Sequence, residues 1–176
     1  MVSDKPPTPK KSTLDTAANV AIILVCAIAA VLMSFNIRDR FFPQRPPGVE
    51  EGEQFAALKQ AVPAGASRAL VVAVSPTCHF CNDSLPFYKH LVDQRNQQGS
   101  AVKFVAAVPN EESRAPETAK FTGAGVQPDS VVPIDFSAIK IPGTPTLLLV
   151  DNNGKVLNVW VGKLDDSSEK EVLKVL

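Results

Sequence analysis

The chain has 176 residues, of which 45% are hydrophobic and 20% charged, and its formal net charge is zero. This length suits one domain with an additional segment. The balanced charge means that the chain has no excess of basic residues to bind phosphates, which excludes a dedicated nucleic-acid-binding protein. The three cysteines are too few for a disulfide framework or for a four-cysteine zinc site.

The first feature along the chain is an apolar segment near the N-terminus. No charged residue or histidine occurs at residues 16–37, and residues 20–35 read VAIILVCAIAAVLMSF. A helix needs about 20 apolar residues to cross the core of a bilayer. We therefore expect a transmembrane helix at residues 17–37, after a short tail at residues 1–16. A buried core helix is the alternative, but it would carry a polar stripe, which this segment lacks.

A cleaved signal peptide is a second alternative for this segment. Its apolar region would be shorter and would end in small residues, whereas residues 32–37 read LMSFNI. We therefore expect an uncleaved signal anchor. Three basic residues lie on each side of it, so the positive-inside rule gives no orientation. They are Lys5, Lys10 and Lys11 before the segment, and Arg38, Arg40 and Arg45 after it.

A proline-rich linker at residues 38–52 and a domain at residues 53–176 are expected next. The linker, RDRFFPQRPPGVEEG, cannot form a regular helix or an internal strand. The apolar pattern of the domain alternates between strand and helix, which predicts an α/β fold with a mixed sheet flanked by helices. The expected strands are 69–74, 102–108, a short extended piece at 131–134, 146–150 and 155–161, the last two around the Asn153-Gly154 turn. The expected helices are 53–62, one from the cysteine pair to residues 97–100, a weak one at 111–121 interrupted by Pro116, and one from Asp165.

Two cysteines, Cys78 and Cys81, directly follow the first buried strand and begin a helix. A helix N-terminus presents free N–H groups and a partial positive charge, which favour a thiolate, and the thiolate is the species that attacks disulfides. The spacing places the second sulfur on the next turn, within bonding reach. We predict a catalytic pair in which Cys78 is the nucleophile and Cys81 resolves the mixed disulfide.

His79 and Phe80 lie between the two cysteines and are predicted to tune the motif. A protonated imidazole next to Cys78 would stabilise the thiolate and make the disulfide more oxidising. The alternative is that His79 simply points to solvent. His90 is expected on the surface, and we expect neither a metal nor a cofactor.

Two structural explanations of the cysteine pair are weaker. A zinc ribbon would need a second Cys-x-x-Cys or paired histidines. A purely structural disulfide would close a loop too short to constrain the unfolded chain by much.

Residues 69–176 resemble the thioredoxin superfamily. A strand leads directly into the Cys78–Cys81 motif, Pro86 follows five residues after Cys81, and Gly143-Thr144-Pro145-Thr146 is similar to the family's Gly-X-Pro-Thr. Residues 147–162, LLLVDNNGKVLNVWVG, resemble the strand-turn-strand-glycine that closes the family's sheet. The resemblance implies a protein thiol–disulfide oxidoreductase, a cis bond before Pro145, and binding of protein thiols or disulfides at Thr144 and Pro145.

The subtype resembles the membrane-tethered bacterial branch that serves cytochrome c maturation. Residues 75–78, Ser-Pro-Thr-Cys, are similar to the thioredoxin-like protein of methylamine dehydrogenase maturation. This implies a single-pass protein of the bacterial inner membrane, with its domain in the periplasm or exterior, where disulfides persist. It also implies a redox partner and a reductant rather than an oxidant. Thr77 replaces the family's usual tryptophan and Val72 its usual buried acid, so the family's usual proton relay for the resolving thiol, and the rate that depends on it, are not transferred.

Two other functions stay open at this stage. One is a copper-binding module for metalloprotein maturation, because thiolates suit Cu(I) and membrane-tethered thioredoxin-like copper chaperones use a cysteine pair with a histidine. Those proteins have a wider cysteine spacing and a distant histidine. The other is a docking module with a vestigial motif.

Overall fold

The structure is a computed structural model of the chain. It describes residues 20–29, 33 and 48–176, and the chain divides into two compact units, 1–45 and 46–176. In the first unit, residues 20–29 and 33 are helical with exposed side chains. Among the described residues, no helix combines the length and apolar character needed to cross a membrane. The predicted tail, residues 17–19, 30–32 and 34–37 of the predicted anchor, and residues 38–47 of the predicted linker lie outside the described residues.

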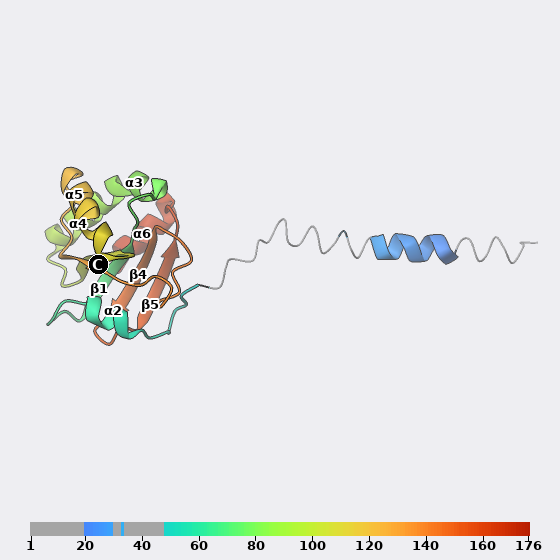
Figure 1. The fold of residues 1–176 in the computed structure, drawn as a ribbon, viewed down its shortest axis with the longest axis horizontal. Helices are drawn as coiled ribbons and strands as arrows, with labels where there is room; N and C mark the ends of the chain where they lie inside the picture. The colour runs from blue at the N-terminus through green and yellow to red at the C-terminus, as the bar shows by residue number, and fades with distance from the viewer. Residues whose placement is uncertain (1–19, 30–32, 34–47) are drawn as a thin grey trace, which may run out of the picture. The chain divides into compact units, whose positions relative to one another are not determined.

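The described part of the second unit is built on a five-stranded mixed sheet (Figure 1) with the strand order β3-β2-β1-β4-β5. Strand β1 pairs in parallel with β2, and β2 with β3, whereas β4 runs antiparallel to both β1 and β5. The predicted mixed sheet is therefore confirmed, and the short extended piece near residue 131 is its edge strand. The strands are β1 (Arg68–Ala73), β2 (Lys103–Val108), β3 (Ser130–Pro133), β4 (Thr146–Asp151) and β5 (Val156–Val161).

Helices cover both faces of this sheet, because successive side chains of its central strands point to opposite sides and both sets are apolar. One face packs against α4 (Leu85–Gln98), α5 (Arg114–Gly123) and α6 (Asp166–Lys174). The other packs against α2 (Ala56–Ala61) and residues 134–141. A five-residue helix, α3 (His79–Asp83), lies at the end of the domain opposite α2 (Figure 1).

The helix predicted after the cysteine pair is in fact two helices, α3 and α4, which meet at Ser84. The backbone of Ser84 stays in the α region, with φ −90° and ψ −6°. Pro86 lies in the first turn of α4, where its missing N–H costs no helical hydrogen bond. Pro116 likewise lies in the first turn of α5, after a 3₁₀ turn at Glu111–Ser113. The expected interruption of the helix at Pro116 is therefore wrong, because a proline in the first turn breaks no helical hydrogen bond.

The predicted hairpin between β4 and β5 is confirmed, and the N-terminal part of the domain packs on its turn. Gly154 has φ +79°, and a Cβ there would lie 2.4 Å from the Phe55 carbonyl oxygen. Phe55 donates its N–H to the Gly154 carbonyl, so α2 begins later than the predicted residue 53. The last residues of the predicted linker pack on the domain too. Val49 is buried and donates its N–H to the Lys140 carbonyl.

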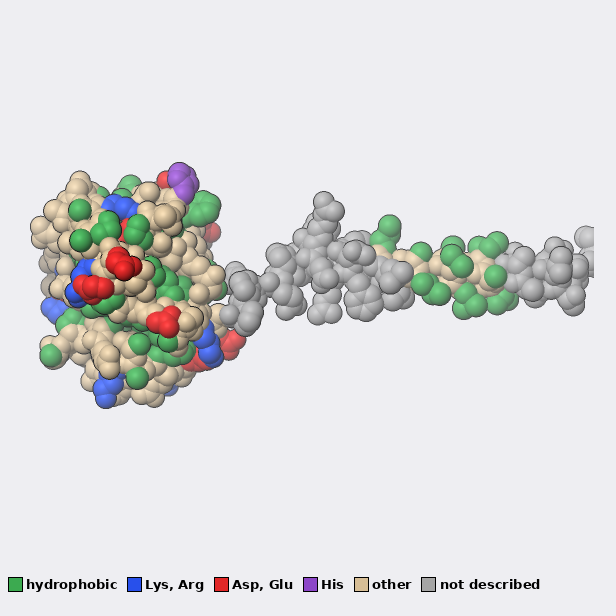
Figure 2. Space-filling model, in the orientation of Figure 1, with side chains coloured by type: hydrophobic (Ala, Val, Ile, Leu, Met, Phe, Trp, Pro, Cys, Tyr) green, Lys and Arg blue, Asp and Glu red, His purple; other side chains and the backbone are tan. Residues whose placement is uncertain are grey.

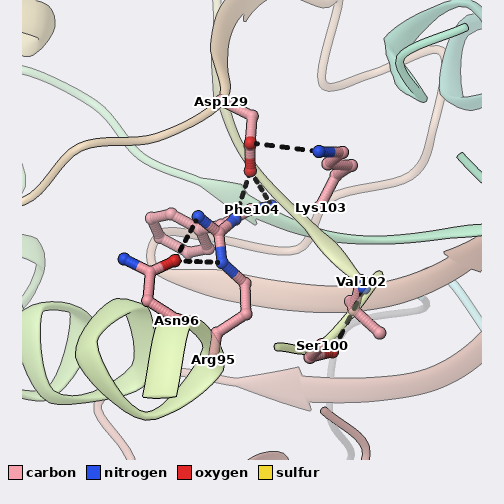
Figure 3. Close-up of polar contacts among 7 residues, drawn as sticks. All are labelled: Arg95, Asn96, Ser100, Val102, Lys103, Phe104 and Asp129. Carbon is pink, nitrogen blue, oxygen red and sulfur yellow. Dashed lines mark hydrogen bonds and ion pairs between the residues drawn. The ribbon is translucent and has the colours of Figure 1, made fainter. Parts of the chain in front are cut away.

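Charged side chains of both signs share the face shown in Figure 2, as the zero net charge leads one to expect. One internal ionic group connects three elements (Figure 3). The Asp129 carboxylate, just before β3, accepts the Phe104 N–H of β2 at 2.8 Å and pairs with Arg95 of α4. Partial burial opposes ionisation of Asp129, but the Phe104 N–H and Arg95 outweigh it and lower the pKa of the carboxyl.

Candidate active site

The predicted cysteine pair lies where β1 ends and α3 begins. Cys78 is the N-cap residue of α3, with an extended backbone at φ −82° and ψ 108°. Its sulfur is bonded to that of Cys81 at 2.13 Å, with a Cα–Cα distance of 5.3 Å. The sulfur also accepts the backbone N–H of Cys81 at 3.0 Å. The predicted placement of Cys78 at the entrance to a helix is confirmed.

The two cysteines differ in their access to solvent. Cys81 is only 2% exposed and lies in the apolar core between the sheet and α4. Cys78 is half-buried at the edge of the same core. The roles predicted for the two residues, attack by Cys78 and resolution by Cys81, fit this difference.

The two residues between the cysteines face outward. The side chain of His79 is 82% exposed, and its Nε2 atom lies 3.6 Å from the Asp83 carboxylate. Lys163, in the loop after β5, lies 3.6 Å from the same carboxylate. Phe80 is 56% exposed, with its ring centroid 6.0 Å from that of His79. A histidine and hydrophobic side chains protrude together at this end of the domain in Figure 2.

The loop at residues 143–145 lies at the same end of the sheet as the cysteine pair. The Thr144–Pro145 peptide bond is cis, as the resemblance implied. Thr146, directly after it, pairs with Ala73, the last residue of the strand that leads to Cys78. The Pro145 carbonyl accepts the Gly162 N–H at 2.7 Å, which connects the loop to the end of β5. The structure thus brings the two pairs of predicted site residues, Cys78 with Cys81 and Thr144 with Pro145, to one end of the domain.

Comparison with known proteins gives a result at the level of structure. No protein-family model matches the chain, and no curated protein matches its sequence. A candidate protein disulfide isomerase from Bacteroides thetaiotaomicron matches 72% of this chain and 88% of its own, with 14% identity and a TM-score of 0.54. The domain has the thioredoxin fold. A candidate thiol-disulfide oxidoreductase from Bacteroides vulgatus matches 67% of this chain and 77% of its own, with 18% identity and a TM-score of 0.50.

In this thioredoxin fold, the position of the superfamily's usual buried acid is apolar. Val72 is fully buried in the same cluster as Cys81. A valine side chain cannot accept a proton from the Cys81 thiol. The valine that stands at the position of the usual acid thus belongs to the same apolar cluster as the second cysteine.

A buried ion pair near the site was missed by the sequence analysis. Glu117 of α5 is 1% exposed, and its carboxylate lies 2.6 Å from Lys120 Nζ. Lys120 also donates to the carbonyl of Pro76, two residues before Cys78. The signal in the sequence was a glutamate three residues before a lysine in a weakly helical stretch, a spacing that is usually found on solvated helix surfaces.

Two expectations about metal ligands concern the same region. His90 is exposed, as predicted. The Nε2 atom of His79, the histidine within the cysteine motif, lies 3.6 Å from the Asp83 carboxylate. Within residues 20–29, 33 and 48–176, no group of three or more His, Cys, Asp or Glu side chains could hold a metal ion.

Proposed function

We propose that the protein is a thiol–disulfide oxidoreductase that uses Cys78 and Cys81 to exchange electrons with protein substrates. The observation that carries the proposal is the position of the Cys78 sulfur. It lies at the N-terminus of α3, accepts a hydrogen bond from the Cys81 N–H at 3.0 Å and is bonded to the Cys81 sulfur. A hydrogen bond from a backbone N–H to sulfur favours the thiolate, which is the attacking form.

The exchange needs no group of this protein besides the two thiols, since the substrate supplies the disulfide. In the reducing direction, the Cys78 thiolate attacks a substrate disulfide, forming a Cys78–substrate disulfide and releasing one substrate thiolate. Cys81 then gives its proton to the substrate thiolate released in the first step and attacks the Cys78 sulfur, which forms the Cys78–Cys81 disulfide and releases the second substrate thiolate. Two electrons pass to the substrate, and a partner dithiol must return two electrons to the pair.

The second step is expected to be the slower one. Cys81 is buried among apolar side chains, including Val72, and apolar surroundings disfavour a thiolate. The Cys78–substrate disulfide should therefore be long-lived. An extended substrate would be held during this time by pairing with the backbone at Thr144, as an added strand, and by apolar contact with the exposed Phe80.

The location and direction that we propose rest on the sequence. Residues 17–37 would anchor the protein in a bacterial inner membrane, because the 22 residues from 16 to 37 carry no charge. The domain would lie in the periplasm or exterior, because disulfides persist outside the cytoplasm. There the pair would act as a reductant toward protein disulfides, as in the branch that the sequence resembles. Proteolysis of intact spheroplasts should then digest the domain, and protection would place it in the cytoplasm.

The activity is tested by reduction of a protein disulfide with the purified full chain and a dithiol as electron donor. Catalysed reduction that is lost in Cys78→Ser supports the proposal. An inert Cys78–Cys81 disulfide overturns it and leaves the docking function. The direction is tested by the reduction potential of the pair, since about −270 mV is typical of a reductant and about −120 mV of an oxidant.

A further inference from the structure

The ion pair between Glu117 and Lys120 differs from the other ion pairs of its kind in the domain. The i,i+4 pair Lys89–Asp93 has the same 2.6 Å separation, but its side chains are 51% and 46% exposed. Glu117 and Lys120 are 1% and 24% exposed. Removing two charges from water costs free energy that their attraction often fails to return, so burial of an ion pair is weak evidence of a role in stability. A role in fixing one local conformation is the better explanation.

The ion pair contacts the turn that leads into Cys78. Residues 75–78 form this turn, in which the Cys78 N–H donates to the Ser75 carbonyl at 3.0 Å. Pro76 lies within the turn and has no N–H, so its carbonyl is its only backbone hydrogen-bonding group. Lys120 Nζ donates to that carbonyl at 3.3 Å, across 44 positions of sequence.

We propose that Glu117 and Lys120 are positioning residues for Cys78. Glu117 orients the ammonium group of Lys120, Lys120 holds the Pro76 carbonyl, and the turn then keeps the Cys78 sulfur in line with the Cys81 N–H. The inference rests on the proposed function, because the alignment matters when Cys78 attacks as a thiolate. Neither residue touches the reacting sulfur atoms, so neither is catalytic.

A positioning role and a purely electrostatic role predict different results. If the pair acted through charge alone, removing the cation would disfavour the Cys78 thiolate and removing the anion would favour it. If the pair acts by position, either change loosens the turn and weakens the hydrogen bond to the sulfur. Both changes then disfavour the thiolate.

The test compares Lys120→Met and Glu117→Gln in the full chain. Each is made in a Cys26→Ser, Cys81→Ser background, so that Cys78 is the sole thiol, and alkylation by iodoacetamide is followed against pH. We expect both variants to shift the profile to higher pH, the glutamine variant less, because its amide oxygen still accepts a hydrogen bond from Lys120. Opposite shifts, or no shift in either variant, would overturn the inference.

The matched control is Arg114→Met. Arg114 of α5 forms an i,i+3 pair with Glu111 and donates to the Val131 carbonyl at 2.9 Å, so it makes the same two kinds of contact away from Cys78. Its profile should equal that of the parent. If Lys120→Met fails to fold by near-ultraviolet circular dichroism, the double variant Glu117→Gln, Lys120→Met removes both charges while keeping the volume. An unshifted profile in that folded double variant also overturns the inference.

A second readout uses the chain with both cysteines. A dithiol that loses stabilisation of its thiolate is a stronger reductant, so the reduction potential of Lys120→Met should be more negative than that of the parent and of Arg114→Met. Neither measurement requires turnover. Failure of the proposed function appears instead as a parent protein that does not reduce a protein disulfide, whatever the variants do.

Discussion

The backbone N–H of Cys81 donates a 3.0 Å hydrogen bond to the sulfur of Cys78. The second cysteine thus supports the first through its main chain as well as through its own sulfur. This main-chain contact survives substitution of the Cys81 side chain. The two tasks of Cys81, stabilising the attacking sulfur and resolving the intermediate, can therefore be separated by mutation.

Cys81→Ser should accumulate disulfides between Cys78 and substrate proteins. The variant keeps the N–H that supports the Cys78 thiolate but lacks the sulfur that would release the substrate. The expected result is a set of complexes that resist detergent and dissociate with a reductant on gel electrophoresis. Cys78→Ser is the matched control, since it leaves the buried Cys81 as the only thiol of the pair and should trap nothing. Trapping by Cys78→Ser instead would reverse the two roles.

Phe80→Ala should weaken binding of protein substrates. Phe80 and Val161 are the large hydrophobic side chains that are exposed in the described part of the domain. Loss of one exposed aromatic contact should raise KM for a protein disulfide by about fivefold, equivalent to about 1 kcal/mol, with a smaller effect on a small disulfide such as oxidised glutathione. Stability should change by less than about 0.5 kcal/mol, because the ring is largely in solvent. An equal change in KM for both substrates would argue against a role in protein binding.

The parts of the fold that could be predicted from the sequence depend on local patterns. The runs ALVVAV at residues 69–74 and TLLLV at residues 146–150 became buried central strands, because apolar runs of this length satisfy both faces of a sheet. Asn153-Gly154 gave the hairpin, since glycine adopts the positive φ of the turn. The position of Cys78 followed from the strand directly before it.

The parts that could not be predicted depend on contacts between distant residues. The burial of Glu117 is set by packing of α5 near Pro76, and no local pattern distinguishes it from an exposed helical glutamate. The break at Ser84 is an exception, because it had a local signal: Asn82 and Asp83 before it are poor helix formers, and Pro86 follows it. The late start of α2 comes from the hydrogen bond between the Phe55 N–H and the Gly154 carbonyl, two residues that lie far apart in the sequence.

Gly154→Ala should destabilise the domain strongly. The residue has φ +79°, and an added Cβ would lie 2.4 Å from the Phe55 carbonyl oxygen and 2.6 Å from the Lys59 nitrogen. Backbone strain and this overlap together should cost about 3 kcal/mol or more. The matched control is Gly65→Ala, where φ is +81° and no atom lies within 4 Å. Its cost should be about 1 kcal/mol, from strain alone. Equal urea midpoints for the two variants would contradict the close contact between α2 and the hairpin.

The carboxylate of Asp165 connects the acid stability of the domain to the start of α6. Asp165 is the N-cap of this helix, and its carboxylate accepts the Ser168 N–H at 2.8 Å and the Ser167 hydroxyl at 2.9 Å. The Ser168 N–H, followed by the Ser167 hydroxyl, lowers the pKa of Asp165 to about 2.

In the unfolded chain this pKa is about 3.9, so the folded state holds the ionised form more strongly. The resulting stabilisation is complete above about pH 5 and is lost progressively as the pH falls toward 1. Asp165→Asn keeps an oxygen that can accept the Ser168 N–H but cannot titrate. Wild type should therefore be the more stable protein at pH 6, and the difference between the two urea midpoints should shrink between pH 4 and pH 2. Other carboxyls with a lowered pKa, such as Asp129, titrate in both proteins and cancel in the difference. A difference that stays constant from pH 6 to pH 2 would mean that the charge of Asp165 does not stabilise α6.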